Sequence, residues 1–139
     1  MDALIDKIKI SPSLLGKLIE TDISKSTDSE LKKSLEKNGY LFLRNIINSD
    51  EIETAKNDVF KRLNEVNELK EPYKNGISSG NSNRDEMYNN RGDFWESVSS
   101  IKSLRQVTNG KILENVFSKI FGSPSLGFDF IFLRAVAGG

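Results

Sequence analysis

Apolar residues recur three or four positions apart between residues 50 and 69, and charged and amide side chains fill the positions between them. This spacing places the apolar residues on one face of an α-helix. The stripe consists of Ile52, Ala55, Val59, Leu63 and Val66. Pro72 prevents the helix from continuing. We therefore predict a long amphipathic helix over residues 50–69 and interpret its charged face as a solvent-exposed surface.

A second helix is predicted over residues 28–38 from the signals at its two ends. Thr27 and Glu30 have the spacing of a capping box, in which each side chain accepts a hydrogen bond from the other residue's main chain. Gly39 can adopt the left-handed conformation that ends a helix. The apolar residues that this helix would bury are Leu31 and Leu35.

Shorter amphipathic segments predict further helices. A proline suits the first turn of a short helix over residues 12–21. After the polar stretch, Asp93 is a suitable N-cap for the next helix. Residues 101–107 predict another short helix. Residues 111–121 carry a longer apolar stripe, and Gly122 is placed to end that helix.

Two apolar runs are better explained as β-strands. Residues 40–43 are rich in aromatic side chains, and their continuous apolar character predicts a strand covered on both faces. Within residues 127–139, phenylalanines alternate with other side chains, which predicts a second strand with two largely apolar faces. Arg134 continues the phenylalanine face, so it either lies on a buried or pocket-facing side or caps the strand end in solvent.

Residues 71–92 form a different kind of segment, rich in asparagine, glycine and serine and poor in apolar side chains. Loops longer than about 12–15 residues are uncommon in compact domains and are usually functional lids or disordered. Both outcomes stay open for this loop. Trp95, just beyond it, is interpreted as an anchor in the core or at the loop.

Composition narrows the chemistry that this chain can perform. Its 139 residues suit about one domain, and its 20 basic and 20 acidic residues give no net charge to attract nucleic acid or an anionic membrane. No apolar run approaches the roughly 20 residues that cross a bilayer, so we expect a cytoplasmic protein. The absence of histidine excludes a His-based nucleophile relay or a two-His-one-carboxylate iron site built from this polypeptide alone.

The predicted strands lack sheet partners within the sequence. Natural domains rarely finish on an unpaired core strand, because its open edge promotes aggregation. The simplest interpretation is that the chain is the opening portion of a larger protein that contains both helices and a β-sheet.

The order of the motifs resembles the N-terminal part of the phytanoyl-CoA dioxygenase family. The resemblance begins with a helix, the strand Lys-Asn-Gly-Tyr-Leu-Phe-Leu-Arg-Asn at residues 37–45, and the helix start Asn-Ser-Asp-Glu at residues 48–51. It continues with a long variable loop, Phe-Trp-Glu at residues 94–96, a helix ending Ile-Phe-Gly, and the phenylalanine-rich strand that leads to two glycines. Most of the chain after residue 28 is covered.

This resemblance implies an α+β fold: the N-terminal helices and first strands of a double-stranded β-helix (jelly roll), truncated before the metal-binding strands. Residues 1–139 would then be the N-terminal part of a single oxygenase domain, with residues 71–92 as a long flexible loop. Family members are mostly Fe(II)- and 2-oxoglutarate-dependent oxygenases that hydroxylate small molecules or acyl thioesters.

The family's iron ligands are a His-x-Asp pair and a distant histidine, and this sequence contains none of these positions. The resemblance therefore assigns no catalytic or metal-binding residue here, and the chain alone is expected to be inactive and to bind neither cofactor. Arg134 is the candidate contributor to the substrate or 2-oxoglutarate pocket. The expected partner of the full-length protein is a small-molecule substrate, with no nucleic acid and no membrane.

The alternative class is non-enzymatic. The residues could form a helical protein-interaction module whose helix over residues 50–69 packs against a partner. The two readings differ in one respect: the oxygenase expects His-x-Asp shortly after Gly139, whereas the module does not.

Overall fold

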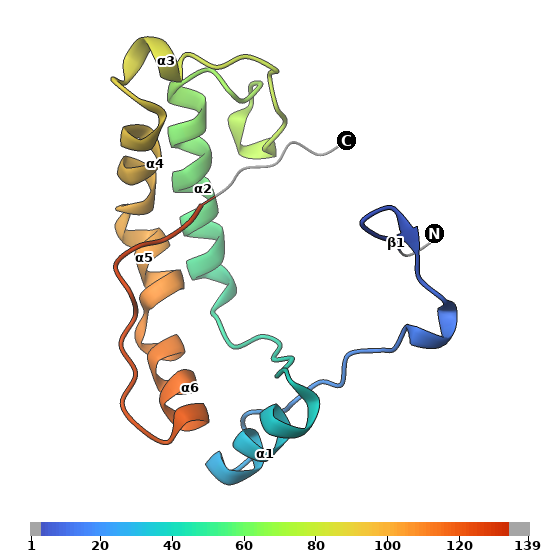
Figure 1. The fold of residues 1–139 in the computed structure, drawn as a ribbon. Coiled ribbons are helices and arrows are strands. Elements are labelled where there is room, and N and C mark those ends of the chain that lie inside the picture. Colours follow the sequence, from blue (N-terminus) through green and yellow to red (C-terminus); the bar gives the residue numbers. More distant parts are fainter. Residues whose placement is uncertain (1–3, 134–139) are drawn as a thin grey trace. The chain divides into compact units, whose positions relative to one another are not determined.

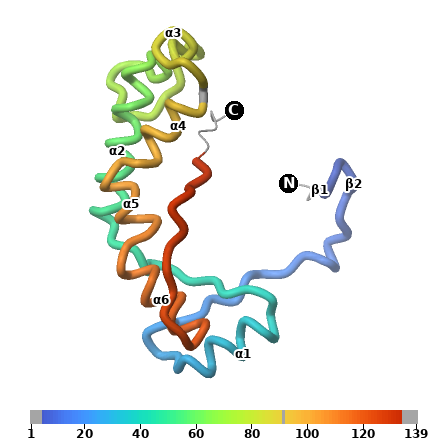
Figure 2. The backbone as a smooth tube through the Cα atoms, turned by 60° about the vertical axis from the view of Figure 1, so that its left-hand side comes forward, coloured from blue at the N-terminus to red at the C-terminus, as the bar shows by residue number. Residues whose placement is uncertain are grey.

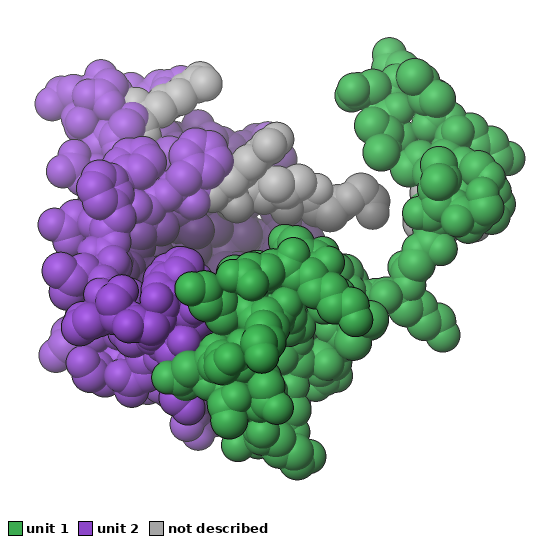
Figure 3. Space-filling view, turned by 60° about the horizontal axis from the view of Figure 1, so that its bottom comes forward, with its two compact units in different colours: residues 1–44 green, residues 45–139 purple. Residues whose placement is uncertain are grey.

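In the computed structural model, which describes residues 4–133, the chain divides into two units after Arg44. Figure 3 colours residues 1–44 and residues 45–139 separately. Each unit is described by itself.

The first unit contains little regular structure before its helix. Two-residue strands β1 (Leu4–Ile5) and β2 (Ile8–Lys9) pair antiparallel as a hairpin. A single 3₁₀ turn, η1 (Pro12–Leu14), follows where the sequence predicts a helix over residues 12–21. That prediction is wrong. The leucines and isoleucine of the predicted stripe are exposed, so the periodic pattern has no surface to pack on, and a short helix without packing is marginal in water.

Helix α1 (Asp28–Asn38) matches the sequence prediction at both ends. The Glu30 N–H donates to the Thr27 hydroxyl, and the Thr27 N–H donates to the Glu30 carboxylate at 2.8 Å, which completes the predicted capping box. The Thr27 N–H and the Thr27 hydroxyl both donate to the Glu30 carboxylate, and these two hydrogen bonds lower the pKa of that carboxyl. Gly39, at φ +73°, ends the helix in the left-handed conformation.

Replacing Thr27 with alanine should destabilise α1 by about 1 kcal/mol, because the Glu30 N–H loses its acceptor. Amide hydrogen exchange within α1 should then accelerate about fivefold. Thr54→Ala is the matched control: the Thr54 hydroxyl donates to the Asp50 carbonyl inside another helix, so this variant should leave exchange in α1 unchanged. Equal acceleration in both variants would contradict the capping role.

Residues 40–43 are extended, and one parallel bridge joins Phe42 to Glu20. The Thr21 N–H donates to the Phe42 carbonyl at 2.8 Å, and the Ile19 N–H donates to the Tyr40 hydroxyl at 3.0 Å. The Arg44 guanidinium lies over the Phe42 ring, 4.5 Å from its centroid. Within this unit, the predicted strand therefore pairs with another segment through a single bridge. Its place in a larger sheet stays a prediction.

The second unit is a bundle of helices (Figure 1). Helix α2 (Ser49–Glu65) begins at Asn48, whose side chain accepts the Asp50 N–H at 2.7 Å. It lies against α4 (Arg91–Ser99) and α5 (Lys102–Asn109), and α6 (Lys111–Phe121) follows. The helices over residues 101–107 and 111–121 were thus predicted close to their observed bounds.

Two predicted helix ends are wrong. Helix α2 stops four residues before residue 69, because Asn67 turns the main chain at φ +61°. Helix α4 begins at Arg91 and its cap is Asn90, whose side chain accepts the N–H of Asp93, the residue predicted to be the cap.

The core of the second unit joins α2, the residues that follow it, and α4. Its fully buried members are Val66, Phe94 and Val98, and Leu63 and Leu69 are nearly so. Phe94 packs edge-on against Tyr88 and Trp95, with ring centroids 5.3 Å and 5.2 Å away. This cluster fixes α4 against α2, and α5 continues the contact, where Ser103 donates to the Asp58 carboxylate at 2.6 Å.

The segment predicted as a long loop contains two short helical turns, η2 (Tyr73–Asn75) and α3 (Arg84–Met87). A bridge joins Leu69 to Ser78, and the peptide bond before Pro72 is cis. The flexibility of residues 71–92 stays a prediction.

Within residues 4–133, no helix combines the length and apolar character needed to span a bilayer. The strands described in this range are those of the N-terminal hairpin. The jelly-roll barrel therefore also stays a prediction.

Candidate functional site

The chain turns back after α6 and borders two pockets in the second unit. Gly122, at φ +68°, ends α6, and residues 126–133 run back along α6 and α5 towards α4 (Figure 2). We call residues 126–133 the return segment. The pockets lie between this segment and the helices that it passes.

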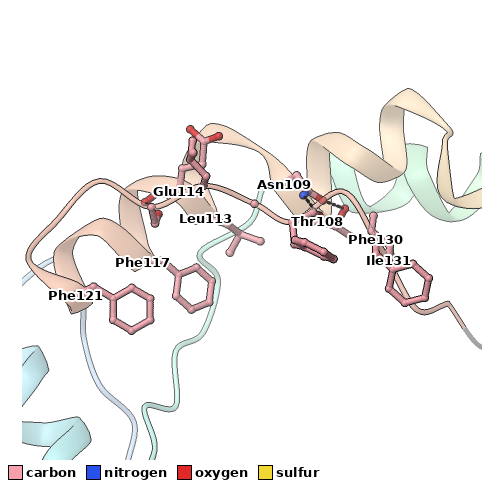
Figure 4. Close-up of a pocket in the computed structure, with 12 residues that line it drawn as sticks. Thr108, Asn109, Leu113, Glu114, Phe117, Phe121, Phe130 and Ile131 are labelled. Carbon is pink, nitrogen blue, oxygen red and sulfur yellow. Dashed lines mark hydrogen bonds between the residues drawn. The ribbon is translucent and has the colours of Figure 1, made fainter.

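The first pocket has a volume of about 410 Å³ and lies between α6, the end of α5 and the return segment (Figure 4). Its walls are largely aromatic. The rings of Phe117 and Phe121 are stacked, with centroids 5.9 Å apart. Thr108, Asn109, Glu114 and Ser125 supply polar side chains to the lining. An apolar slot with a polar edge suits an apolar or aromatic group.

Polar contacts fasten the return segment to the helices. The Ser125 N–H, just before this segment, donates to the Ser118 hydroxyl at 2.9 Å. The Asn109 side-chain amide donates to the Phe128 carbonyl at 2.9 Å (Figure 4). A Cβ at Gly127 would lie 2.4 Å from that amide nitrogen, so a larger residue here would push the Asn109 side chain away from its present position.

The second pocket, of about 790 Å³, lies between α4, α5 and residues 129–133. It is lined by both signs of charge, with Arg105 opposed by Asp93, Glu96 and Asp129, and Trp95 forms part of its wall. Such a lining can orient a polar small molecule. Among the described residues, no three Asp, Glu, His or Cys side chains come together as metal ligands.

Exposure alternates over residues 130–133 of the return segment, whereas residues 126–129 are all exposed. The side chains of Phe128, Phe130 and Phe132 are 80%, 72% and 81% exposed. Ile131 and Leu133 are half-buried, and Leu133 packs against the core around Phe94. A period of two residues is that of an extended strand. Residues 130–133 therefore have one face on the helices and a second face that carries Phe130 and Phe132.

Arg84 holds the loop segment against the aromatic core. Its guanidinium lies over the rings of Phe94 and Trp95, 4.5 Å and 4.3 Å from their centroids, and forms an ion pair with Glu68. Ser82 also donates to the Glu68 carboxylate, at 2.6 Å. The prediction that Trp95 is an anchor at the core and the loop is confirmed.

The sequence predicted the alternating phenylalanines of this region but not the contacts of Arg84 and Asn109. Arg134, the predicted pocket residue, lies outside the described residues. The roles of Arg84 and Asn109 were missed, because each depends on a partner at least sixteen residues away and no local pattern marks such a pair. The alternation of the phenylalanines was predicted, but not which face of the strand packs on helices.

In comparisons with known proteins, no family model matches the chain, and no curated protein or solved structure is significantly similar to it.

Proposed function

We propose that this chain is the N-terminal part of a cytoplasmic Fe(II)- and 2-oxoglutarate-dependent oxygenase that resembles the phytanoyl-CoA dioxygenase family. In this proposal the fold is α+β, and the helices of the second unit cover the outside of a jelly-roll barrel. The return segment is one of the first barrel strands. The full-length protein hydroxylates a small molecule or an acyl thioester.

The observation that carries the proposal is the alternating exposure of residues 130–133 in the return segment. Contiguous apolar patches on a protein surface usually mark a site of contact. Here the patch consists of the exposed rings of Phe128, Phe130 and Phe132, and Leu133 of the same segment packs against the helical core. A strand in a sheet with helices on one side and further strands on the other has this pattern.

The position of α2 also favours the oxygenase over the interaction module. The module needs the apolar stripe of α2 for a partner. Ala55 and Leu63 of that stripe are 4% exposed, although Ile52 at its start is 43% exposed. Leu63 packs in the core with residues of α4. This helix therefore acts as part of a core, as a flanking helix of a larger fold would.

The residues of this chain do not fit the iron site that the family implies. The sequence has no histidine, and the described residues assemble no cluster of acidic ligands. A two-His-one-carboxylate site therefore cannot be built from residues 1–139. The proposal places iron and 2-oxoglutarate on later strands, assigns no reaction step to the described residues, and expects this chain alone to be inactive.

Reading the coding sequence beyond codon 139 tests the proposal most directly. We expect a His-x-Asp motif within a few dozen codons and, in the full-length protein, consumption of 2-oxoglutarate that requires both Fe(II) and O₂. A stop codon directly after Gly139, together with a cooperatively melting product, would overturn the oxygenase and favour the interaction module.

Arg134→Ala in the full-length protein tests the one site residue proposed from the sequence. It should raise KM for 2-oxoglutarate or for the substrate, whereas Lys119→Ala, at an exposed position of α6, should change neither. Unchanged KM values for both ligands would remove Arg134 from the pocket.

A further inference from the structure

The second pocket is lined by charged side chains of both signs that do not neutralise each other. Arg105 of α5 lines it, and so do Glu96 of α4 and Asp129 of the return segment. Among the described residues, none of these three side chains takes part in an ion pair. One positive group and two negative groups therefore border the same pocket without direct contact between them.

Arg105 is half-buried, whereas Glu96 and Asp129 are exposed. A guanidinium stays charged in a protein, and a charge that is partly removed from water is unfavourable unless an anion pairs with it. The third carboxylate of the lining, Asp93, is already engaged: it accepts the Asn90 side-chain amide at 2.7 Å as part of the helix cap. Arg105 is thus left to pair with an anion from outside the chain.

The remaining wall of the second pocket suits the apolar body of a ligand. Ile131 and Leu133, which are half-buried, line the side formed by the return segment, and Trp95 lines the side formed by α4. The volume of about 790 Å³ lies within the range of about 300–1,000 Å³ that is typical of small-molecule sites.

We propose that the second pocket binds a zwitterionic small molecule, an α-amino acid with an apolar side chain. Arg105 pairs with the carboxylate of the amino acid, and Glu96 and Asp129 pair with its ammonium group. The apolar side chain of the ligand lies against Trp95 and Leu133. A simple anion would meet the two carboxylates and a simple cation would meet the guanidinium, so each suits this pocket less well than a molecule that carries both charges.

This inference is separate from the oxygenase proposal. The residues that line the second pocket lie within residues 90–133. The chain of 139 residues should therefore bind the amino acid without iron or 2-oxoglutarate.

Titration of the 139-residue chain with phenylalanine and with leucine tests the site. Trp95, the single tryptophan, lines the pocket, so its fluorescence should change saturably. Phenylethylamine lacks the carboxylate of phenylalanine, and phenylpropionate lacks its ammonium group. Each should bind at least about tenfold more weakly than phenylalanine, because it loses hydrogen bonds to a charged group. No saturable binding of either amino acid, or equal affinities for phenylalanine and its two analogues, would overturn the proposal.

Arg105→Gln tests the carboxylate side of the site. It should weaken the binding of phenylalanine by at least about tenfold and should not weaken that of phenylethylamine, which has no carboxylate. Lys102→Gln removes a cation from an exposed position of the same helix, outside the second pocket, and should change neither affinity. Phenylalanine binding that is unaffected by Arg105→Gln would contradict the assigned pairing.

A double variant, Glu96→Gln with Asp129→Asn, tests the ammonium side. It should weaken the binding of phenylalanine by at least about tenfold and should not weaken that of phenylpropionate. Both positions are exposed, so the urea midpoint should stay close to that of the parent chain. A double variant that binds phenylalanine as tightly as the parent would overturn the proposal. None of these outcomes bears on the oxygenase assignment, which the coding sequence beyond residue 139 tests independently.

Discussion

Replacing Phe94 with alanine should destabilise the second unit by about 3–5 kcal/mol. The Phe94 side chain is fully buried, and its ring contacts Tyr88, Trp95 and the guanidinium of Arg84. Truncation removes these contacts and leaves a cavity between α2 and α4. Since small domains are stable by about 5–15 kcal/mol, this loss is a large share of the total.

Urea denaturation followed by the fluorescence of Trp95, the single tryptophan, measures this loss. Phe121→Ala is the matched control, because it makes the same chemical change at a ring that is 60% exposed. It should shift the free energy of unfolding by less than about 1 kcal/mol. Similar losses in the two variants would show that Phe94 is not the centre of the core.

The helices that sequence reasoning placed best are those with local signals at their ends. Helix α1 has a capping box and a C-terminal glycine, and α6 ends at Gly122. These signals act through hydrogen bonds and main-chain conformations within a few residues of the helix end. They are therefore visible in the sequence and independent of tertiary packing.

Periodicity predicted burial in α2 better than it predicted where the helix ends. Val66 and Leu69 continue the apolar stripe and are indeed buried, at 0% and 8% exposure, although both lie beyond Glu65. A turn at Asn67 reverses the main chain and still directs them into the core. An apolar stripe reports which residues are buried, and a turn can bury them as well as a helix can.

The candidate site depended on contacts that no local pattern encodes. Alternation predicted two faces for the return segment, yet which face packs depends on Leu133 reaching the core around Phe94. The polar composition of residues 71–92 predicted a loop, but the ion pair between Glu68 and Arg84 fastens that loop to the aromatic cluster. Composition describes the average environment of a segment, whereas such anchors are single long-range contacts.

Removing the Arg84 guanidinium should destabilise the second unit by about 2 kcal/mol. The side chains of Arg84 and Glu68 are 16% and 17% exposed, so water screens the pair only weakly. Arg84→Met leaves the Glu68 carboxylate half-buried without its cation and removes the contacts to both rings. Arg84→Lys should recover only part of this loss, because a lysine lacks the planar group that lies over the rings of Phe94 and Trp95.

A double-mutant cycle isolates the ion pair from the ring contacts. Combining Glu68→Gln with Arg84→Met should destabilise by less than the sum of the single changes, with a coupling of about 1–3 kcal/mol in urea denaturation. Lys111 and Glu114, on the surface of α6, provide the control pair: their side chains are 78% and 29% exposed, and their coupling should be about 0.5 kcal/mol or less. If the two cycles gave the same small coupling, the Glu68–Arg84 pair would act as an ordinary surface contact, and the loop over residues 71–92 would need another anchor.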